Sequence, residues 1–181
     1  MPDTAIRLLR DLRAVRRFAP RAVPDGAVRD LLEVARWTGS GRNRQPWELI
    51  LVREPATLGA LAEAGASPGT RHLATAPLAV LLVMSGPGTE FDEGRLAERI
   101  MLAAAAHGLG SGIAGFRGAG PVDTARELLG VPAERVLRTA VCVGYPAEHG
   151  ASDAVVGKSL PLGRKPLAEF VHFEHYGRRD G

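Results

Sequence analysis

Hydrophobic residues along this 181-residue chain recur at two spacings, one typical of helices and one typical of buried strands. Apolar positions three and four residues apart predict five helices. The first is expected after Asp3 and the second after residues 24–26. The others are expected from Pro55 to about Ala64, at residues 92–108 and at residues 121–130. The pattern over 92–108 is the clearest, because it has a broad apolar face and ends at Gly108, which suits the left-handed position past a helix end. We expect it to be the central helix.

Four short apolar segments predict strands, at residues 47–53, 76–84, 110–116 and 135–146. The first two are so apolar that we expect both to lie inside a sheet. Residues 38–46 and 149–157 have the composition of loops, and residues 163–177 are expected to form an extended tail with a few apolar anchors. Helices and strands alternate without a linker or repeat. The pattern therefore predicts one domain over residues 1–181, of the α/β or α+β class, with one sheet between helical layers.

The composition is that of an ordinary globular protein, with 45% hydrophobic residues and a mean hydropathy of −0.01. The apolar run at residues 77–84 is far shorter than the roughly 20 residues that cross a bilayer, so we expect no membrane insertion. Cys142, the single cysteine, lies in apolar sequence, which favours a core residue in a protein of the reducing cytoplasm. Net charge is +3, but aromatic residues are only 5% and no nucleic-acid motif occurs. An anionic small molecule is the favoured partner, and no nucleic acid is expected.

Several motif matches do not support the chemistry they first suggest. Residues 110–115, GSGIAG, have the spacing of a dinucleotide-binding loop, but a predicted helix precedes them where that motif requires a strand. We therefore favour a glycine-rich strand whose backbone a flat group can approach. The five histidines form no metal-ligand pattern, so no metal site is expected. Ser40 and Ser111 lack the context of known nucleophile motifs.

Two clusters remain as candidates for binding chemistry. Arg13, Arg16 and Arg17 lie at a predicted helix-to-loop junction, where guanidinium groups can hold a phosphate or a carbonyl oxygen. The loop SGRNRQPW at residues 40–47 places the amides of Asn43 and Gln45 before a large aromatic residue. Such a loop suits hydrogen bonding to a heterocycle.

Six segments carry a family resemblance. They are RAVRRFAPRAVP (13–24), GSGRNRQPWELILV (39–52), HLATAPLAVLLV (72–83), DEGRLAERIMLAAAAHGLGSGIAGF (92–116), ELLGVPAERVLRTAVCVGYPAE (127–148) and GRKPLAEFVHFE (163–174). In this order, over about residues 6–174, they resemble the flavin-dependent nitroreductase family. The resemblance implies an α+β fold with a mixed central sheet flanked by helices, and an intertwined homodimer with two FMN sites at its interface. Residues 158–181 are then a C-terminal arm packed on the partner subunit.

The activity implied by the resemblance is that of an NAD(P)H-dependent flavin oxidoreductase with FMN as cofactor. A reduced nicotinamide, NADH or NADPH, delivers hydride to the flavin and leaves, and an electron-poor small molecule such as a nitroaromatic or quinone takes its place. The flavin carries this ping-pong chemistry, so no catalytic side chain is required.

The resemblance also implies which residues bind FMN. The phosphate and the pyrimidine edge are bound by the segment that contains Arg13, Ala14, Arg16 and Arg17. The phosphate is covered by Arg164 and Lys165. From the neighbouring subunit come Ser40, Gly41, Asn43 and Gln45. The backbone that faces the ring belongs to Gly112, Ile113, Ala114 and Gly115. Arg71 and His72 are candidate replacements for a ribityl-binding asparagine of the family.

The chain departs from the family at several positions. Leu12 and Ala14 stand where many members have arginine and serine, Gly69 stands near the ribityl-binding asparagine, and Ala114 replaces a common acidic residue. Only SGPGTEF, residues 85–91, separates the strand at 76–84 from the central helix, where larger members insert helices, so a more open pocket is expected. These departures leave two alternatives: a specialised flavin-fold enzyme (flavin-fragmenting, dehalogenating or deazaflavin-using), or a non-catalytic flavin-binding module.

Overall fold

The computed structural model describes residues 2–147 and 163–179, which form six helices and four strands. The helices are α1 (Pro2–Asp11), α2 (Asp25–Arg36), α3 (Pro55–Ala64), α4 (Glu90–Ala106), α5 (Ala119–Leu129) and α6 (Leu167–Phe170). The strands are β1 (Trp47–Val52), β2 (Leu78–Met84), β3 (Gly110–Gly115) and β4 (Val136–Gly144). Short 3-10 helices occupy Gly41–Asn43 and Arg71–Thr75. The five predicted helices and four predicted strands are therefore confirmed, and α4 begins two residues earlier than predicted.

The four strands form one sheet in the order β1-β2-β4-β3, and each of the three pairings is antiparallel. The α+β class is confirmed. The expectation of a mixed sheet is corrected among the described strands, because the parallel component is confined to an isolated bridge between Ala14 and Ser111. The expectation that the strand at 47–53 is internal was wrong, since β1 is an edge strand and Leu51 on it is exposed. Its apolar sequence reflects packing on both faces, since Trp47 and Leu49 contact one core layer and Ile50 and Val52 the other.

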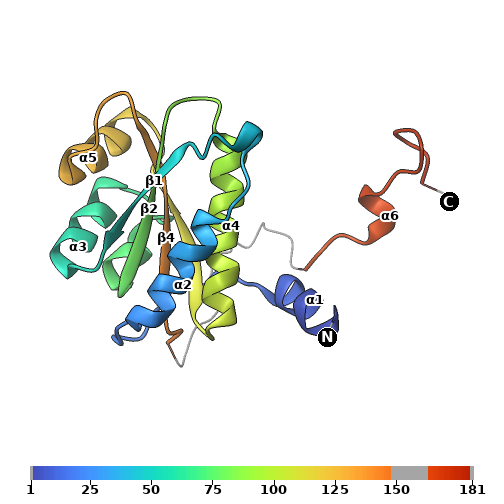
Figure 1. The fold of residues 1–181 in the computed structure, drawn as a ribbon, viewed down its shortest axis with the longest axis horizontal. Coiled ribbons are helices and arrows are strands. Elements are labelled where there is room, and N and C mark those ends of the chain that lie inside the picture. Colours follow the sequence, from blue (N-terminus) through green and yellow to red (C-terminus); the bar gives the residue numbers. More distant parts are fainter. Residues whose placement is uncertain (1, 148–162, 180–181) are drawn as a thin grey trace.

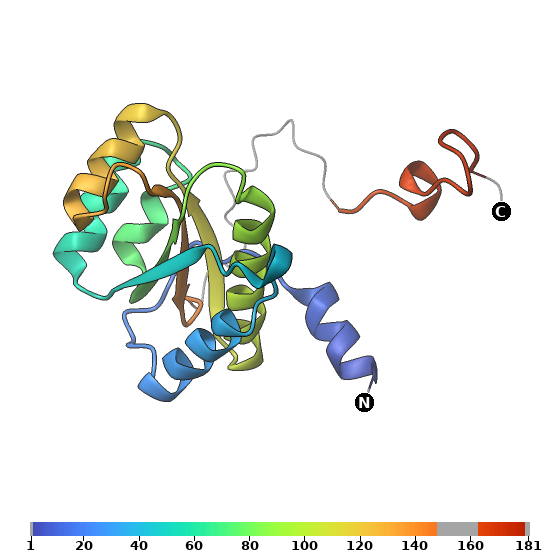
Figure 2. The ribbon, with the colours of Figure 1, turned by 45° about the horizontal axis from the view of Figure 1, so that its top comes forward.

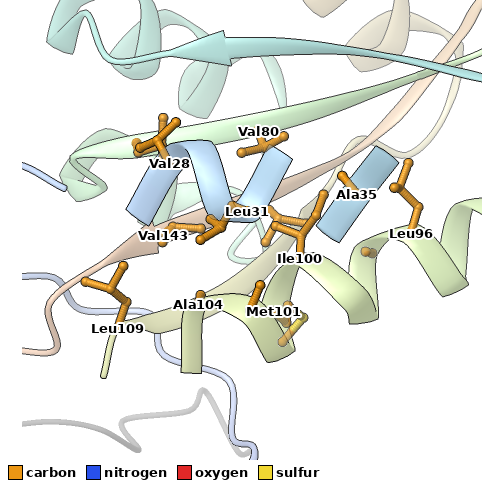
Figure 3. Close-up of a cluster of buried hydrophobic side chains, with 14 of the residues drawn as sticks. Val28, Leu31, Ala35, Val80, Leu96, Ile100, Met101, Ala104, Leu109 and Val143 are labelled. Carbon is orange, nitrogen blue, oxygen red and sulfur yellow. The ribbon is translucent and has the colours of Figure 1, made fainter. Parts of the chain in front are cut away.

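Helices cover both faces of this sheet, giving three layers (Figure 1). On one face α2 and α4 pack on Val80 and Val143, as Figure 3 shows. On the other face α3 and α5 pack with the 3-10 helix Arg71–Thr75. Side chains along β2 alternate between the two layers, with Leu82 in the first and Leu81 in the second. Because both layers are apolar, every residue of β2 is buried.

Two of the sequence predictions fall within these layers. Cys142 is fully buried in β4, and burial raises the pKa of its thiol far above the usual range, so it is a core residue as predicted. Gly108 has a φ of 69° just past the end of α4, in the left-handed region that favours glycine. Beside it Nε2 of His107 lies 2.9 Å from Oδ2 of Asp30, a contact that joins the end of α4 to α2.

The two ends of the described chain lie away from the sheet. In Figure 2, α1 and the segment with α6 both extend beyond α4. The predicted extended tail contains the single helical turn α6, and four of its large side chains are exposed: Leu167, Phe170, Phe173 and Tyr176. The predicted loop at 149–157 lies outside the described residues. None of the helices in the described ranges is long and apolar enough to span a bilayer.

A β-bulge at Arg138 connects the sheet to the start of α4. In the pairing of β2 with β4, Leu82 is opposite Thr139 but Val83 is opposite Leu137, so Arg138 is the extra residue. Its Nε donates to Oε2 of Glu93 at 2.7 Å, and its Nη2 lies 3.1 Å from Oε1 of Glu90. The Glu93 side chain is only 6% exposed. A buried carboxylate of this kind depends on its cationic partner.

We predict that Arg138→Ala lowers the free energy of unfolding by about 2 to 3 kcal/mol, because it leaves the Glu93 carboxylate buried and uncompensated. Urea unfolding followed by circular dichroism measures the change. Arg53→Ala is the matched control, since it breaks a 2.8 Å pair with Asp25 in which both side chains are largely exposed. That variant should lose less than about 1 kcal/mol. Equal losses in the two variants would show that Glu93 does not need Arg138.

Candidate functional site

The segment Ala14–Phe18, here called the crossing segment, runs over the start of β3. It begins with the Ala14–Ser111 bridge, in which the Val15 N–H donates to the Ser111 carbonyl at 2.7 Å. It ends at Phe18, which is bridged to Pro146 just after β4. The segment therefore spans from the free edge of β3 to the neighbouring end of β4.

Two glycines of β3 allow the crossing segment to lie so close. A Cβ on Gly110 would meet the Val15 side chain at 2.7 Å, and a Cβ on Gly112 would meet the Val15 carbonyl oxygen at 2.3 Å. Neither separation is sterically allowed, so both positions need glycine. The glycine-rich strand is confirmed, but the group that approaches Gly110 and Gly112 is the chain's own Val15.

Beyond Ser111 the outer edge of β3 is open. The Ser111 carbonyl faces outward to Val15, whereas the Phe116 N–H donates inward to Arg138 of β4 at 2.9 Å. Because backbone groups of successive strand residues point to opposite sides, Ile113 and Gly115 face outward with Ser111. None of the residues described in the structure pairs with these two N–H groups. The edge therefore offers main-chain donors to a ligand, beside an Ile113 side chain that is 44% exposed.

Ala114 and Gly112, unlike Ile113, do not present backbone groups at the open edge of β3. The Ala114 side chain is fully buried in the core, and by the same alternation its backbone faces β4. Of the four β3 residues predicted to face a ring, Ile113 and Gly115 thus present free backbone groups, while Gly112 and Ala114 shape the strand behind them.

His72 lies under the crossing segment, beside Gly112. The ring is 95% buried, and a Cβ on Gly112 would lie 3.5 Å from its Nε2. Neither ring nitrogen has a hydrogen bond of acceptable geometry to any residue that the structure describes. Burial first, and then the positive charge of Arg16, lower the pKa of His72 below its usual 6.5, and the Gly112 backbone opposes the shift. His72 is therefore neutral at neutral pH.

Of the three predicted arginines, Arg16 is the one whose charge acts on His72. Arg13, Arg16 and Arg17 all have exposed side chains, and Nη1 of Arg13 donates to the carbonyls of Arg10 and Leu12 at 2.7 and 2.8 Å. Arg13 shares a cavity of about 590 Å³ with Ala14 and Arg164, between α1 and α4. Lys165 follows Arg164 and is exposed. The structure thus brings Arg13 and Arg164, two predicted phosphate ligands from opposite ends of the chain, to one cavity.

The loop from Ser40 to Gln45 lies elsewhere. The Gln45 N–H donates to Oγ of Ser40 at 2.8 Å, and Nε2 of Gln45 donates to Oδ1 of Asn43 at 3.2 Å. Arg42, Asn43 and Gln45 all have positive φ values, between 48° and 56°, so this backbone is held in a region that L-residues rarely adopt. Gly41 is exposed and opens the 3-10 turn.

Within one chain this loop and the β3 edge do not share a described cavity. Gln45 lines a cavity with the 85–89 connection, near the start of α4, whereas the crossing segment lies at the opposite edge of the sheet. The resemblance assigns the loop to the site of a neighbouring subunit, which stays a prediction.

Sequence reasoning missed two residues of the site. Val15 connects the crossing segment to β3, and the Ser111 hydroxyl is buried with no partner among the described residues. The spacing of Gly110 and Gly112 signals a close approach, but it does not say which residue approaches.

We predict that Gly112→Ala displaces the crossing segment and lowers the free energy of unfolding by about 1 to 3 kcal/mol, because the new Cβ overlaps the Val15 carbonyl. Denaturant unfolding measures the loss. Gly59→Ala in the middle of α3 is the control, since its Cβ would meet nothing within 4 Å. It should stabilise by about 0.5 to 1 kcal/mol. A Gly112→Ala protein as stable as the wild type would contradict the close contact.

The lowered pKa of His72 predicts a pH dependence of stability. Below about pH 6.5 the unfolded chain protonates His72 while the folded protein keeps it neutral, so the unfolded state binds more protons and stability falls as pH falls. His72→Phe cannot titrate and should lose less stability between about pH 7.5 and about pH 5.5. Unfolding in urea at the two pH values measures this difference, and the other histidines cancel in the comparison. The same loss in both proteins would refute a buried neutral His72.

Comparison with known proteins agrees with this architecture. A model of the Nitroreductase family matches residues 9–81 and 86–145. A relative named NADH dehydrogenase, from Thermus thermophilus, is 30% identical over 201 residues, covering 88% of this chain and 90% of the relative. An FMN-dependent nitroreductase from Clostridium difficile R20291 has the same fold, with a TM-score of 0.79 at 23% identity over 94% of this chain and 99% of that one. So does an FMN and NADPH-dependent nitroreductase from Sphigopyxis sp. strain HMH, with a TM-score of 0.77 at 21% identity, covering 95% and 99%. Since the family model spans most of the sequence, the chain belongs to the nitroreductase family.

Proposed function

We propose that this protein is an FMN-dependent oxidoreductase. It takes hydride from NADH or NADPH and reduces an electron-poor small molecule, such as a nitroaromatic or a quinone. The observation that carries the proposal is the open edge of β3 beside the arginines of the crossing segment. The printed names of the relatives, NADH dehydrogenase and FMN-dependent nitroreductase, support the same cofactor and reductant.

The residues present fit the parts of FMN. A phosphate needs cations, and the cavity shared by Arg13 and Arg164 is lined by three arginines, the third being Arg10, against two carboxylates, Asp11 and Glu98. A flat heterocycle with polar edges needs main-chain donors, which Ile113 and Gly115 offer on the open edge. Ala14 replaces a hydroxyl common in the family, so the phosphate depends more heavily on the arginines.

When bound, FMN supplies the hydride chemistry, and the protein supplies position and charge. Arg16 gives the crossing segment a positive charge beside β3. This charge would stabilise negative charge that develops on a bound ring. The Ile113 N–H would donate to an edge of the bound ring. Reductant and acceptor use the exposed face in turn, which is a ping-pong order and requires no acid or base from the protein.

We propose that the active species is a homodimer. The loop Ser40–Gln45 completes the site of the partner subunit, because within one chain it lines a different cavity from Arg13. The described residues of the predicted C-terminal arm, 163–179, pack on that partner. Four large apolar or aromatic side chains exposed in its described part, Leu167, Phe170, Phe173 and Tyr176, supply the apolar surface for such a contact. The reducing cytoplasm remains our prediction for where the enzyme works.

We propose that the acceptor side of each site is open, because in the proposed dimer it lies beside the β2–α4 connection of the neighbouring subunit, which shares a cavity with Gln45. The connection from β2 to α4 consists only of residues 85–89, and Phe91 on α4 is 76% exposed. A short connection leaves little chain to cover the ring, so we propose that acceptors of different shapes are reduced.

The test is an anaerobic absorption spectrum of the purified protein reconstituted with FMN, before and after NADH or NADPH is added. We expect bound FMN whose absorption near 450 nm bleaches, at a rate that identifies the preferred nicotinamide. Bound FMN that neither nucleotide bleaches would favour a flavin-binding module. A protein that binds no FMN would overturn the proposal, and a deazaflavin would be tried next.

Variants make this test specific for the site. Arg16→Ala should bind FMN at least about tenfold more weakly, the loss expected for one charge-assisted contact. The matched control is Arg29→Ala, which removes an exposed arginine on α2, outside the crossing segment. It should bind FMN like the wild type. Equal affinity in the two variants would remove Arg16 from the site.

A further inference from the structure

A cavity of about 470 Å³ lies at the end of the sheet where β1 begins and β2 ends. We call it the connection cavity, because the connection between β2 and α4 forms one of its walls. The remaining walls come from the start of β1 with the loop before it, and from the residue before β4. The lining residues are 44–48, 85–89 and Arg135. None of them also lines the described cavity of Arg13 and Arg164, so the two cavities are distinct.

Hydrogen bonds within the chain hold the walls of the connection cavity in place. The Ser85 N–H donates to the Pro46 carbonyl at 2.9 Å, which joins the end of β2 to the start of β1. The Thr89 hydroxyl donates to the Gly86 carbonyl at 2.7 Å, and Thr89 is buried. These bonds close the short connection on itself and on β1, so the hollow between them is part of the fold.

Flat side chains line part of this cavity. Trp47 supplies an indole, and Pro46 and Pro87 supply two pyrrolidine rings. Trp47 packs on the core layer that contains Val80, but it is not fully buried. A planar aromatic ligand matches such walls, because aromatic rings bury a large area against flat neighbours.

Arg44 is the charge at this cavity that the described residues leave unpaired. Nη2 of Arg135 lies 2.7 Å from Oε1 of Glu48, so the other two charges of the lining offset each other. Arg44 is exposed, and its Nε donates to the Gly41 carbonyl at 3.3 Å. Its Nη groups have no ion pair or hydrogen bond with any residue that the structure describes. They are therefore available for a bidentate pair with a carboxylate.

The connection cavity adjoins the residues that we propose for the flavin of the partner subunit. Asn43 and Gln45 flank Arg44, and Gln45 also lines the cavity. Both neighbours have positive φ values, 56° and 48°, whereas Arg44 has a φ of −69°. In the proposed dimer Gln45 therefore borders both the flavin and this cavity. A substrate whose ring lies on that flavin can extend a substituent toward Arg44.

We propose that the connection cavity holds the anionic group of an aromatic acceptor, and that Arg44 is the residue that selects it. The preferred acceptor is then a nitroaromatic or quinone that carries a carboxylate. The inference rests on the proposed function, from which it takes the flavin and the homodimer. It goes beyond that function by naming the charge class of the acceptor and the residue that recognises it.

The kinetic test compares 4-nitrobenzoate with the uncharged 4-nitrobenzamide as acceptors for the FMN-loaded enzyme. The ratio of the two kcat/KM values is measured in the wild type and in two variants, so the different intrinsic reactivity of the compounds cancels. We expect Arg44→Gln to lower the ratio about tenfold, the loss of one charge-assisted pair. Arg42→Gln makes the same change of charge two residues away, outside the lining of the cavity, and should keep the ratio. An unchanged ratio in Arg44→Gln, or an equal fall in both variants, would overturn the proposal.

Two further comparisons separate this role from other roles of Arg44. Arg44→Lys retains the charge and should recover part of the ratio that Arg44→Gln loses, whereas a value equal to that of Arg44→Gln would count against an electrostatic role. NADPH has a 2′-phosphate that NADH lacks, and is the other substrate that brings an additional anionic group. The NADPH to NADH ratio of kcat/KM, measured with 1,4-benzoquinone, should be the same in Arg44→Gln as in the wild type. A fall in this ratio alone would assign Arg44 to the reductant and overturn the proposal.

Binding to the cavity is measured separately, without turnover. The chain has two tryptophans, Trp37 and Trp47, and Trp47 lines the cavity. In a Trp37→Phe background, a nitroaromatic bound in the cavity quenches the fluorescence of Trp47. We expect Arg44→Gln to weaken 4-nitrobenzoate about tenfold and to leave 4-nitrobenzamide unchanged. Equal affinities for 4-nitrobenzoate with and without Arg44 would contradict the proposal.

Failure of this inference is distinguishable from failure of the proposed function. If the protein binds FMN and NADH or NADPH bleaches it, but neither the acceptor ratio nor the quenching depends on Arg44, only the role of Arg44 is lost. If the protein binds no FMN, the proposed function and the acceptor role fall together. The Trp47 titration needs neither FMN nor a reductant, so it still decides whether the cavity binds a carboxylate.

Discussion

The close contact between Val15 and the glycines of β3 is the constraint on which the candidate site depends. The Val15 N–H is bound to the Ser111 carbonyl at 2.7 Å, and its own carbonyl lies where a Cβ of Gly112 would be. This contact fixes the crossing segment over the sheet, so the arginines on it project to solvent beside β3. It also occupies the edge of β3 only at Ser111, which leaves Ile113 and Gly115 open. The contact between Val15 and β3 therefore both packs the crossing segment on the sheet and leaves the main-chain donors of Ile113 and Gly115 free for a ligand.

A second interaction holds the strand behind the site. The bulge at Arg138 turns its guanidinium toward Glu93 on α4, while its carbonyl accepts the hydrogen bond from Phe116 at the end of β3. One residue thus connects the central helix, β4 and the strand that offers its edge to a ligand. Removal of Arg138 leaves the Glu93 carboxylate buried without its cation, so the stability of this end of the sheet depends on the pair. A rigid strand suits a site whose donors are main-chain groups.

The polar groups of the site are divided between fixed and movable parts. The β3 backbone and His72 are buried or built into the sheet, whereas Arg13, Arg16 and Arg164 are exposed. Fixed groups suit a planar ring, because its geometry does not vary. Exposed arginines suit a phosphate, which accepts hydrogen bonds from many directions. The strained loop at Arg42, Asn43 and Gln45 is a third, separate element, in accord with our proposal that it serves a second subunit.

The sequence by itself determined the helices, the strands and the family. Spacing of apolar residues is a local property, and the motifs at 13–24, 39–52 and 92–116 are contiguous, so both are legible without a structure. The tertiary structure alone decided that β1 is an edge strand, that the sheet is antiparallel, and that Arg138 forms a bulge. It also decided that Val15 fills the space over Gly110 and Gly112 and that His72 is buried without a described partner. These features depend on which strands pair and in what register. Strand pairing joins residues that are far apart in the chain, and the local hydrophobic pattern of a strand is the same whether it lies at the edge or inside the sheet and whether its neighbour is parallel or antiparallel.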